Sequence, residues 1–189
     1  MEQLRHFIKQ LSPEISELEL DYIVAKFKIK AFAKDKFLVK KLQVCTDFMI
    51  VKEGCFRIFY THENKEINSW FAFDMTPTTE MHSFITQKPS DYYIQAVENS
   101  EIYSITRHDL KELYKQFNAF QKFGLQLTEI MLTKTIERLK SFQFETAEER
   151  YQNILHDPNY TQRLPLKDLA SFIGVTPNSL SRLRNNSKK

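Results

Sequence analysis

The pattern of hydrophobic and polar residues divides the chain into a helical start, a strand-rich middle and a helical end. Residues 1–27 have apolar positions at helical spacing. Within them Ser12-Pro13 has the form of a helix start, with Ser as N-cap and Pro at the first helical position. Short runs rich in Phe, Ile, Val and Tyr then alternate with polar breaks up to Ile105, and helical spacing returns after Thr106. This order predicts an α+β protein.

Seven of the short runs have the length and composition of β-strands. The breaks between them hold turn residues, as in Lys52-Glu53-Gly54 and Glu98-Asn99-Ser100. Strands spaced in this way are typical of an antiparallel sandwich or barrel. The predicted strands are residues 29–32, 37–39, 48–51, 56–60, 67–73, 92–97 and 102–105.

The helical segment after Thr106 has apolar residues on more than one side. Residues 110–117 give one apolar face, and residues 120–139 give two more. A helix of this kind covers its own domain and something else. A second copy of the chain is the economical partner, since two-fold homodimers are the commonest oligomers. The alternative is an ordinary core helix in a monomer.

A small helical unit is predicted at the end of the chain. Residues 141–145 have the character of a hinge, and residues 146–149 have the pattern of a capping box that opens a further helix. Asp157-Pro158-Asn159 is expected to end that helix. We therefore divide the chain into a strand-rich domain (residues 1–116), a long helix with its hinge (residues 117–143) and a terminal helical domain (residues 144–189).

Composition and charge indicate a function for the terminal domain. Three widely separated glycines in 189 residues exclude a P-loop and a dinucleotide fingerprint, which need clustered glycines against a phosphate. The net charge is +3, but residues 163–189 hold six basic residues and one acidic residue. They carry +5 and leave −2 on residues 1–162. A positive end on a slightly acidic body indicates binding of a polyanion.

Other features of the composition indicate a cytoplasmic protein that does not enter a membrane. No apolar run approaches the roughly 18 residues of a membrane span, and the first residues lack the apolar core of a signal peptide. Cys45 and Cys55 form neither a disulfide framework nor a metal pair, which fits a reducing compartment.

Residues 166–185 meet the physical requirements of a helix-turn-helix. Gly174 lies where the turn needs a left-handed backbone conformation, and Thr176-Pro177 has the form of the start of the second helix. Polar side chains on one face of that helix suit base edges in the major groove, where an arginine grips guanine O6 and N7. The residues expected to read bases are Asn178, Ser179, Arg182 and Asn185. The residues expected to contact DNA phosphates are Arg163, Lys167, Thr176 and Arg184.

Residues 147–151 and 164–184 resemble the Crp/Fnr superfamily of bacterial transcription regulators, most of all the divergent branch common in Bacteroidetes. Residues 51–57 are similar to a hairpin of the family's sensor domain. The resemblance covers nearly the whole chain. It implies an N-terminal antiparallel β-roll of the cyclic-nucleotide-binding type (a double-stranded β-helix), a long dimerisation helix, and a helix-turn-helix that binds a palindromic operator in double-stranded DNA.

The resemblance also bears on individual residues and partners. Arg182 falls on the family's base-reading arginine position, whereas Pro177 stands where well-studied members often have a second arginine. Their operator sequence is therefore not expected here. The chain ends five residues after Arg184, so we expect no full C-terminal wing. A homodimer and RNA polymerase are the protein partners that the resemblance implies.

Nucleotide-binding members of the family carry a Gly-Glu element and, further along, an Arg-Ser pair that grips the cyclic phosphate. The corresponding residues 74–93 contain neither glycine nor arginine, and Ser90-Asp91 stands in place of the Arg-Ser pair. Asp91 would repel a phosphate, so we expect that cyclic AMP does not bind in the family's way. Either another small effector fills an apolar pocket in the roll, or the aromatic residues there are simply core. The candidate pocket residues are Arg57, Trp70, Glu80, His82, Tyr92 and Tyr93.

Two other functions stay open on the sequence. A cupin-like metal enzyme would need paired histidines and a glutamate around one metal, but His62 and Glu66 have no second histidine beside them. A ligand-sensing interaction protein would not need the polar surface of residues 176–184. Two cysteines cannot supply the four thiolates of an iron–sulfur cluster, and no nucleophile–base pair is visible. We therefore expect a regulator and not an enzyme, with no metal site and with its cofactor unknown.

Overall fold

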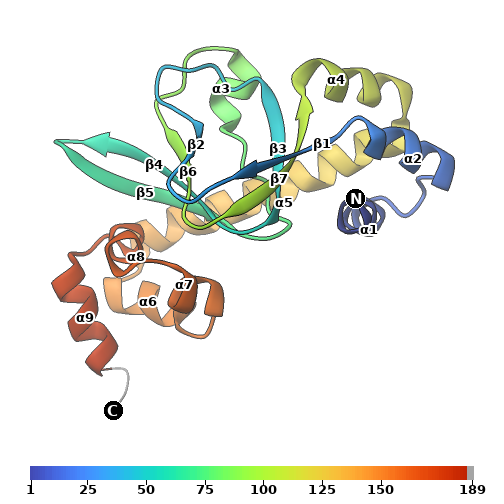
Figure 1. The fold of residues 1–189 in the computed structure, drawn as a ribbon. Coiled ribbons are helices and arrows are strands. Elements are labelled where there is room, and N and C mark those ends of the chain that lie inside the picture. The colour runs from blue at the N-terminus through green and yellow to red at the C-terminus, as the bar shows by residue number, and fades with distance from the viewer. Residues whose placement is uncertain (187–189) are drawn as a thin grey trace.

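A seven-stranded β-roll lies over a long helix, and a group of short helices lies at the far end of that helix (Figure 1). The computed structural model describes residues 1–186. Its elements are α1 (Glu2–Leu11), α2 (Glu17–Ala25), β1 (Lys28–Phe32), β2 (Phe37–Val39), β3 (Asp47–Glu53), β4 (Phe56–His62), β5 (Lys65–Ala72), α3 (Met81–Thr86), β6 (Tyr93–Ala96), β7 (Ser100–Thr106), α4 (Arg107–Gln116), α5 (Asn118–Phe144), α6 (Ala147–Leu155), α7 (Pro158–Arg163), α8 (Leu166–Ile173) and α9 (Pro177–Asn186).

The roll consists of two antiparallel sheets with the strand orders β1-β7-β3 and β2-β6-β4-β5. All seven predicted strands are confirmed, each end to within two residues. Apolar side chains from both sheets form the core between them, where Ile50, Phe56, Ile94 and Ile102 have no exposed surface. This is the inward-facing half of the alternating pattern that predicts the strands.

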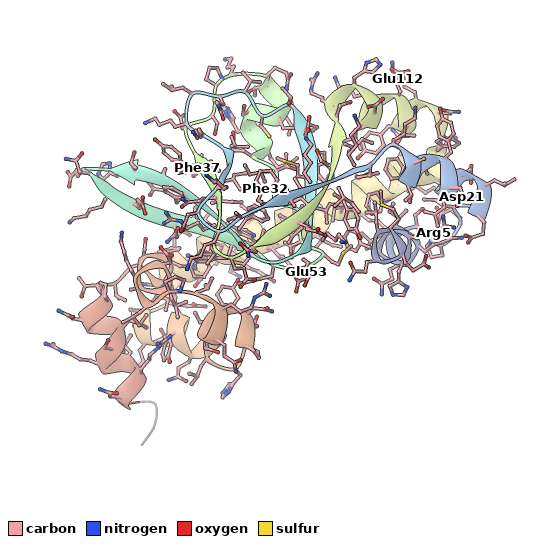
Figure 2. All side chains as sticks on the ribbon, viewed as in Figure 1. Arg5, Asp21, Phe32, Phe37, Glu53 and Glu112 are labelled. Carbon is pink, nitrogen blue, oxygen red and sulfur yellow. The ribbon has the colours of Figure 1, made fainter. Side chains whose placement is uncertain are left out.

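The helix start predicted at Ser12-Pro13 is wrong. Ser12 follows the last residue of α1, and its hydroxyl donates to the carbonyl of Ala119 in α5 at 2.8 Å. Helix α2 begins after Ser16, which forms a capping box with Glu19. Arg5 joins the two helices through ion pairs with residues of α2, and Figure 2 labels Arg5 and its partner Asp21.

Helix α5 has one face on the roll and another in solvent. Phe120, Phe123 and Leu127 are buried against the roll and the N-terminal helices. A second face carries leucines seven residues apart, and these side chains are more than half exposed. They are Leu125, Leu132 and Leu139.

The terminal helices have a hydrophobic core of their own that extends onto the roll. Thr146 and Glu149 form the predicted capping box at the start of α6. Tyr151 of α6 and Leu169 and Ile173 of α8 are buried together with Phe71 of β5. The terminal helices are therefore packed on the β4–β5 edge of the roll as well as joined to α5. None of the helices among residues 1–186 is both long and apolar enough to cross a membrane.

Candidate functional site

Helices α8 and α9 form a helix-turn-helix around Gly174. Gly174 is the C-cap of α8 in the left-handed conformation, with φ of 87°, as the sequence predicts. The amides of Gly174 and Val175 both donate to the carbonyl of Ala170, which closes the turn. Thr176 accepts a hydrogen bond from the amide of Ser179 at 3.2 Å and so caps α9, which begins at Pro177.

The residues predicted to read bases lie along one side of α9, whose far end points away from the roll (Figure 1). Asn178, Arg182 and Asn185 are exposed at helical spacing, whereas Ser179 is half-buried. The Ser179 hydroxyl lies 3.0 Å from the hydroxyl of Thr176. Three of the four side chains are thus presented to solvent on a helix with no acidic residue in its first turn.

The residues predicted to contact phosphates differ in their exposure and in their ion pairs. Lys167 is three-quarters exposed, and its ammonium lies 3.9 Å from Glu66. Arg184 is half-buried on α9. Arg163 instead pairs with Glu98 and Asp74 of the roll, and although burial opposes the charge, the hydrogen bond to Glu98 raises the pKa of Arg163. A role for Arg163 in phosphate binding would require both pairs to break.

Hydrogen bonds join helix α8 to strands β4 and β5 of the roll. The guanidinium of Arg57 in β4 donates to Asp168 at 3.1 Å, and the side-chain amide of Asn68 in β5 donates to the same carboxylate at 3.2 Å. The hydroxyl of Ser171 accepts from the backbone amide of Asn68 and donates to the carbonyl of Glu66, each at 3.0 Å. The first helix of the helix-turn-helix therefore covers the free edge of β5, the last strand of its sheet.

Replacing Asp168 with alanine is expected to destabilise the protein by about 1–3 kcal/mol, because the half-buried Arg57 and the buried Asn68 would each lose a charged acceptor. The midpoint of chemical denaturation measures this change. Lys167→Ala is the matched control, and since Lys167 is exposed we expect an effect within about 0.5 kcal/mol. Equal effects of the two variants would mean that the contacts of Asp168 with Arg57 and Asn68 add no stability.

An apolar cavity of about 350 Å³ lies between the roll and α5. Most of its wall is hydrophobic, and its lining includes Phe48, Ile58, Pro77, Met81, Leu127 and Met131. Trp70 and Arg138 complete one part of the wall. A cavity of this size and character suits a small, mainly apolar ligand.

The structure does not bring the six predicted pocket residues together. Of these six, Trp70 alone lines the apolar cavity. Arg57 is held by Glu66, Gln95 and Asp168. The remaining four lie elsewhere. Glu80 caps a helix, His82 is exposed, Tyr92 packs on Tyr60, and Tyr93 stacks on Phe59.

In residues 74–93, the segment expected at a cyclic phosphate, polar side chains of the chain itself bind the backbone amides. The buried carboxylate of Glu80 accepts from the amides of His82 and Ser83 at the start of α3, at 3.2 and 2.9 Å. Ser90 is fully buried, and its hydroxyl accepts from the amide of Tyr92. Asp91 is exposed. The amides of His82 and Ser83 are therefore already bound to a carboxylate.

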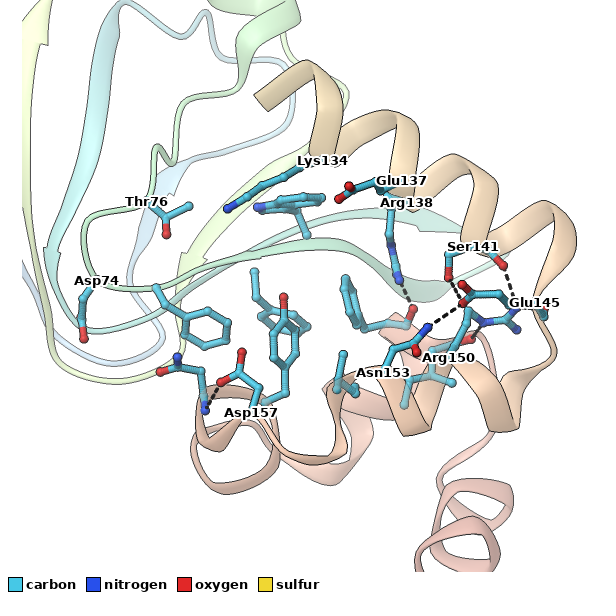
Figure 3. A pocket seen from close by; sticks show the side chains of 18 residues that line it. Asp74, Thr76, Lys134, Glu137, Arg138, Ser141, Glu145, Arg150, Asn153 and Asp157 are labelled. Atoms are coloured by element: carbon cyan, nitrogen blue, oxygen red, sulfur yellow. Dashed lines mark hydrogen bonds between the residues drawn. The ribbon is translucent and has the colours of Figure 1, made fainter. Parts of the chain in front are cut away.

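A second cavity of about 510 Å³ lies where the roll, α5 and the terminal helices meet (Figure 3). At its edge, two arginines hold the end of α8. The guanidinium of Arg138 in α5 donates to the carbonyl of Phe172, and that of Arg150 in α6 donates to the carbonyl of Ile173. Both guanidinium groups lie over the ring of Phe142, at 4.3 and 5.0 Å from its centre. The helix-turn-helix is thereby tied to the long helix.

Sequence reasoning did not single out Arg138, although it is the residue that joins both cavities to the helix-turn-helix. Among residues 1–186 there is no group of three or more His, Cys, Asp or Glu side chains that could hold a metal ion. Burial raises the pKa of the Cys45 thiol to about 11 and raises that of Cys55 further. Neither cysteine has the lowered pKa of a reactive thiol.

The comparisons with known proteins agree with this architecture. Residues 29–117 match the family model of the cyclic nucleotide-binding domain. A search among curated protein sequences finds no match. Many solved structures share the fold, at low sequence identity.

Several of these structures cover most of the chain, among them the following three. FixK2 from Bradyrhizobium japonicum has 12% identity and a TM-score of 0.74, over 85% of this chain and 83% of its own. A transcriptional regulator of the Crp/Fnr family from Eubacterium rectale has 15% identity and a TM-score of 0.70, over 94% and 86%. The c-di-GMP responsive global regulator CLP from Xanthomonas campestris has 15% identity and a TM-score of 0.69, over 92% of each chain.

Proposed function

The chain has the fold of the Crp/Fnr regulators, with a cyclic nucleotide-binding domain at residues 29–117, and from this we propose that it is a homodimeric, sequence-specific DNA-binding transcription regulator. The observation that carries the proposal is the helix-turn-helix, whose second helix presents Asn178, Arg182 and Asn185 to solvent. Amide and guanidinium groups at this spacing match base edges in the major groove.

The exposed face of α5 supports the homodimer. Leu125, Leu132 and Leu139 repeat every seven residues, and Ile136 extends the same face. Apolar residues at this repeat form the seam of a two-stranded coiled coil. Two recognition helices related by a two-fold axis then read the two halves of a palindromic operator.

Selection of binding sites from random double-stranded DNA tests this function. We expect one palindromic sequence to be enriched, with its half-sites about one helical turn apart. Binding to that sequence is expected to weaken by roughly 0.9 log unit per log unit of salt for each phosphate contact. Recovery of no preferred sequence would contradict the proposal and would favour a ligand-sensing interaction protein.

Cyclic AMP is not the effector that this arrangement favours. Glu80 already occupies the amides at the start of α3, and Asp91 adds a negative charge nearby in the sequence. The cavity between the roll and α5 is mainly apolar, and a cyclic phosphate there would lose its hydration without gaining enough donors.

A calorimetric titration of the full chain with cyclic AMP is expected to show no binding at micromolar concentrations. The physical reason is that a cyclic phosphate needs several donors, whereas Arg138 is the one arginine that lines the apolar cavity among residues 1–186, and it already donates to the carbonyl of Phe172. A cyclic-nucleotide-dependent regulator titrated under the same conditions is the control. Saturable micromolar binding to the chain would contradict this prediction.

A further inference from the structure

Two buried N–H groups lack acceptors at the place where the two cavities meet. The indole nitrogen of Trp70 and Nε of Arg138 are both shielded from solvent, and neither has a hydrogen-bond partner among residues 1–186. Both residues line the apolar cavity and also the junction cavity. Buried donors are nearly always satisfied in folded proteins, so an acceptor is missing at this position.

Arg138 also carries a positive charge without a matching carboxylate. Its guanidinium donates to the carbonyl of Phe172 and lies 3.5 Å from the centre of the Phe172 ring. Burial lowers the pKa of Arg138 to about 10, so the group is still charged at neutral pH. No carboxylate of the described chain forms an ion pair with it. The missing acceptor is therefore best supplied by an anion.

The lining of the apolar cavity next to these donors determines the chemical class of ligand that fits it. Arg138 is the one charged residue among the described residues that line it, and the other polar groups there are small hydroxyls and the Trp70 indole. The complementary molecule has an apolar body and a single negative end.

We propose that the cavity binds an apolar monocarboxylate, whose two oxygens accept from Arg138 Nε and Trp70 Nε1 after a small turn of these side chains toward the cavity, since neither nitrogen has exposed surface in this structure. The proposal rests on the proposed function, since it names the ligand class for the cavity between the roll and α5. Two free donors match two carboxylate oxygens, whereas a phosphate would leave an oxygen unpaired in an apolar wall.

The ligand would act on DNA binding through Arg138. The Arg138 guanidinium donates to the carbonyl of Phe172 at the end of α8. A carboxylate that binds Arg138 competes with this hydrogen bond and so shifts the position of the helix-turn-helix. Binding of the acid and of DNA are then coupled, and each alters the affinity for the other by the same factor.

Trp70 is the sole tryptophan of the chain, and its fluorescence reports on this site directly. We would titrate the full chain with hexanoate, octanoate and decanoate, and with 1-octanol and octylamine as matched probes. The expected result is a saturable change of Trp70 emission with the acids. Affinity should rise roughly fourfold per added methylene until the cavity is full. The alcohol and the amine should bind at least about tenfold more weakly.

Three variants locate the site. Arg138→Gln should weaken octanoate binding by about tenfold or more, whereas Lys134→Gln should leave it unchanged, because Lys134 lines the junction cavity and not the apolar cavity. Thr128→Phe fills part of the apolar cavity and leaves Arg138 intact. The longest acids should then no longer bind, whereas the shorter ones still should. This third variant decides the matter if Arg138→Gln does not fold.

Three results would overturn the proposal. They are acids that bind no better than the alcohol, an affinity that does not depend on chain length, and a loss of binding in Lys134→Gln alone. Operator binding is measured separately on the same protein. If the acids fail while operator binding holds, only the ligand class is wrong and the proposed function stands.

Discussion

Replacing Leu132 with glutamate is expected to convert the proposed dimer to monomers and to weaken operator binding by about 10²–10⁴-fold. Leu132 lies in the middle of the exposed leucine repeat of α5. In a two-fold seam the change buries two carboxylates near each other, at a cost of several kcal/mol. Once the dimer is lost, the second recognition helix no longer benefits from the effective concentration that the first one provides.

Light scattering with size exclusion measures the oligomeric state, and a titration of labelled operator DNA measures the affinity. Ile130→Glu is the matched control, because Ile130 is also an exposed apolar residue of α5 but lies on a different face from the Leu132 repeat. We expect that variant to stay dimeric. A monomeric wild-type protein, or monomers from both variants alike, would rule out this seam.

Replacing Arg182 with alanine is expected to remove much of the sequence preference of DNA binding. A bidentate contact of arginine with guanine is worth about 1–3 kcal/mol of discrimination, or roughly 5- to 150-fold per half-site. Arg182 is exposed on α9, and its side chain has neither an ion pair nor a hydrogen bond in the part of the chain that the structure describes. Binding-site selection with the two proteins compares their preferred sequences.

Arg184→Ala is the control for Arg182→Ala. Arg184 is predicted to contact a phosphate, so its loss should weaken binding to all sequences about equally and lower the salt slope by about one. Selection of the same sequence with undiminished affinity by Arg182→Ala would show that Arg182 does not read a base.

Local patterns were enough to predict most of the elements. The strands follow from runs of aromatic and β-branched residues between turns, and their ends agree to within two residues. The turn at Gly174 and the caps at Thr146 and Thr176 depend on neighbours within four residues, so the sequence contains all that is needed.

The errors in the fold come from competing signals. Ser12-Pro13 has the form of a helix start, but the hydroxyl of Ser12 binds Ala119, a contact across 107 residues that no local pattern contains. The true start at Ser16 does carry a local signal, the Ser16–Glu19 capping box. Helix α3 has six residues and is capped by a glutamate, so its sequence shows little periodicity.

Apart from Trp70, the residues of the two cavities could not be identified from the sequence. Trp70 and Arg138 line the same cavity only because α5 packs on the roll, and the partners of Arg163 lie in the roll, 65 and 89 residues earlier. Net charge places Arg163 with the basic terminal residues, but the folded chain pairs it with Glu98 and Asp74.

The contact between Ser171 and β5 restricts how the protein can change shape. Strand β5 is the last strand of its sheet, and Ser171 satisfies the Asn68 amide and the Glu66 carbonyl there. A movement that lifts α8 would open a strand edge, which is a template for pairing with other chains. Signalling by large displacement of the terminal helices therefore carries a risk of aggregation, whereas a small rotation that keeps this contact does not.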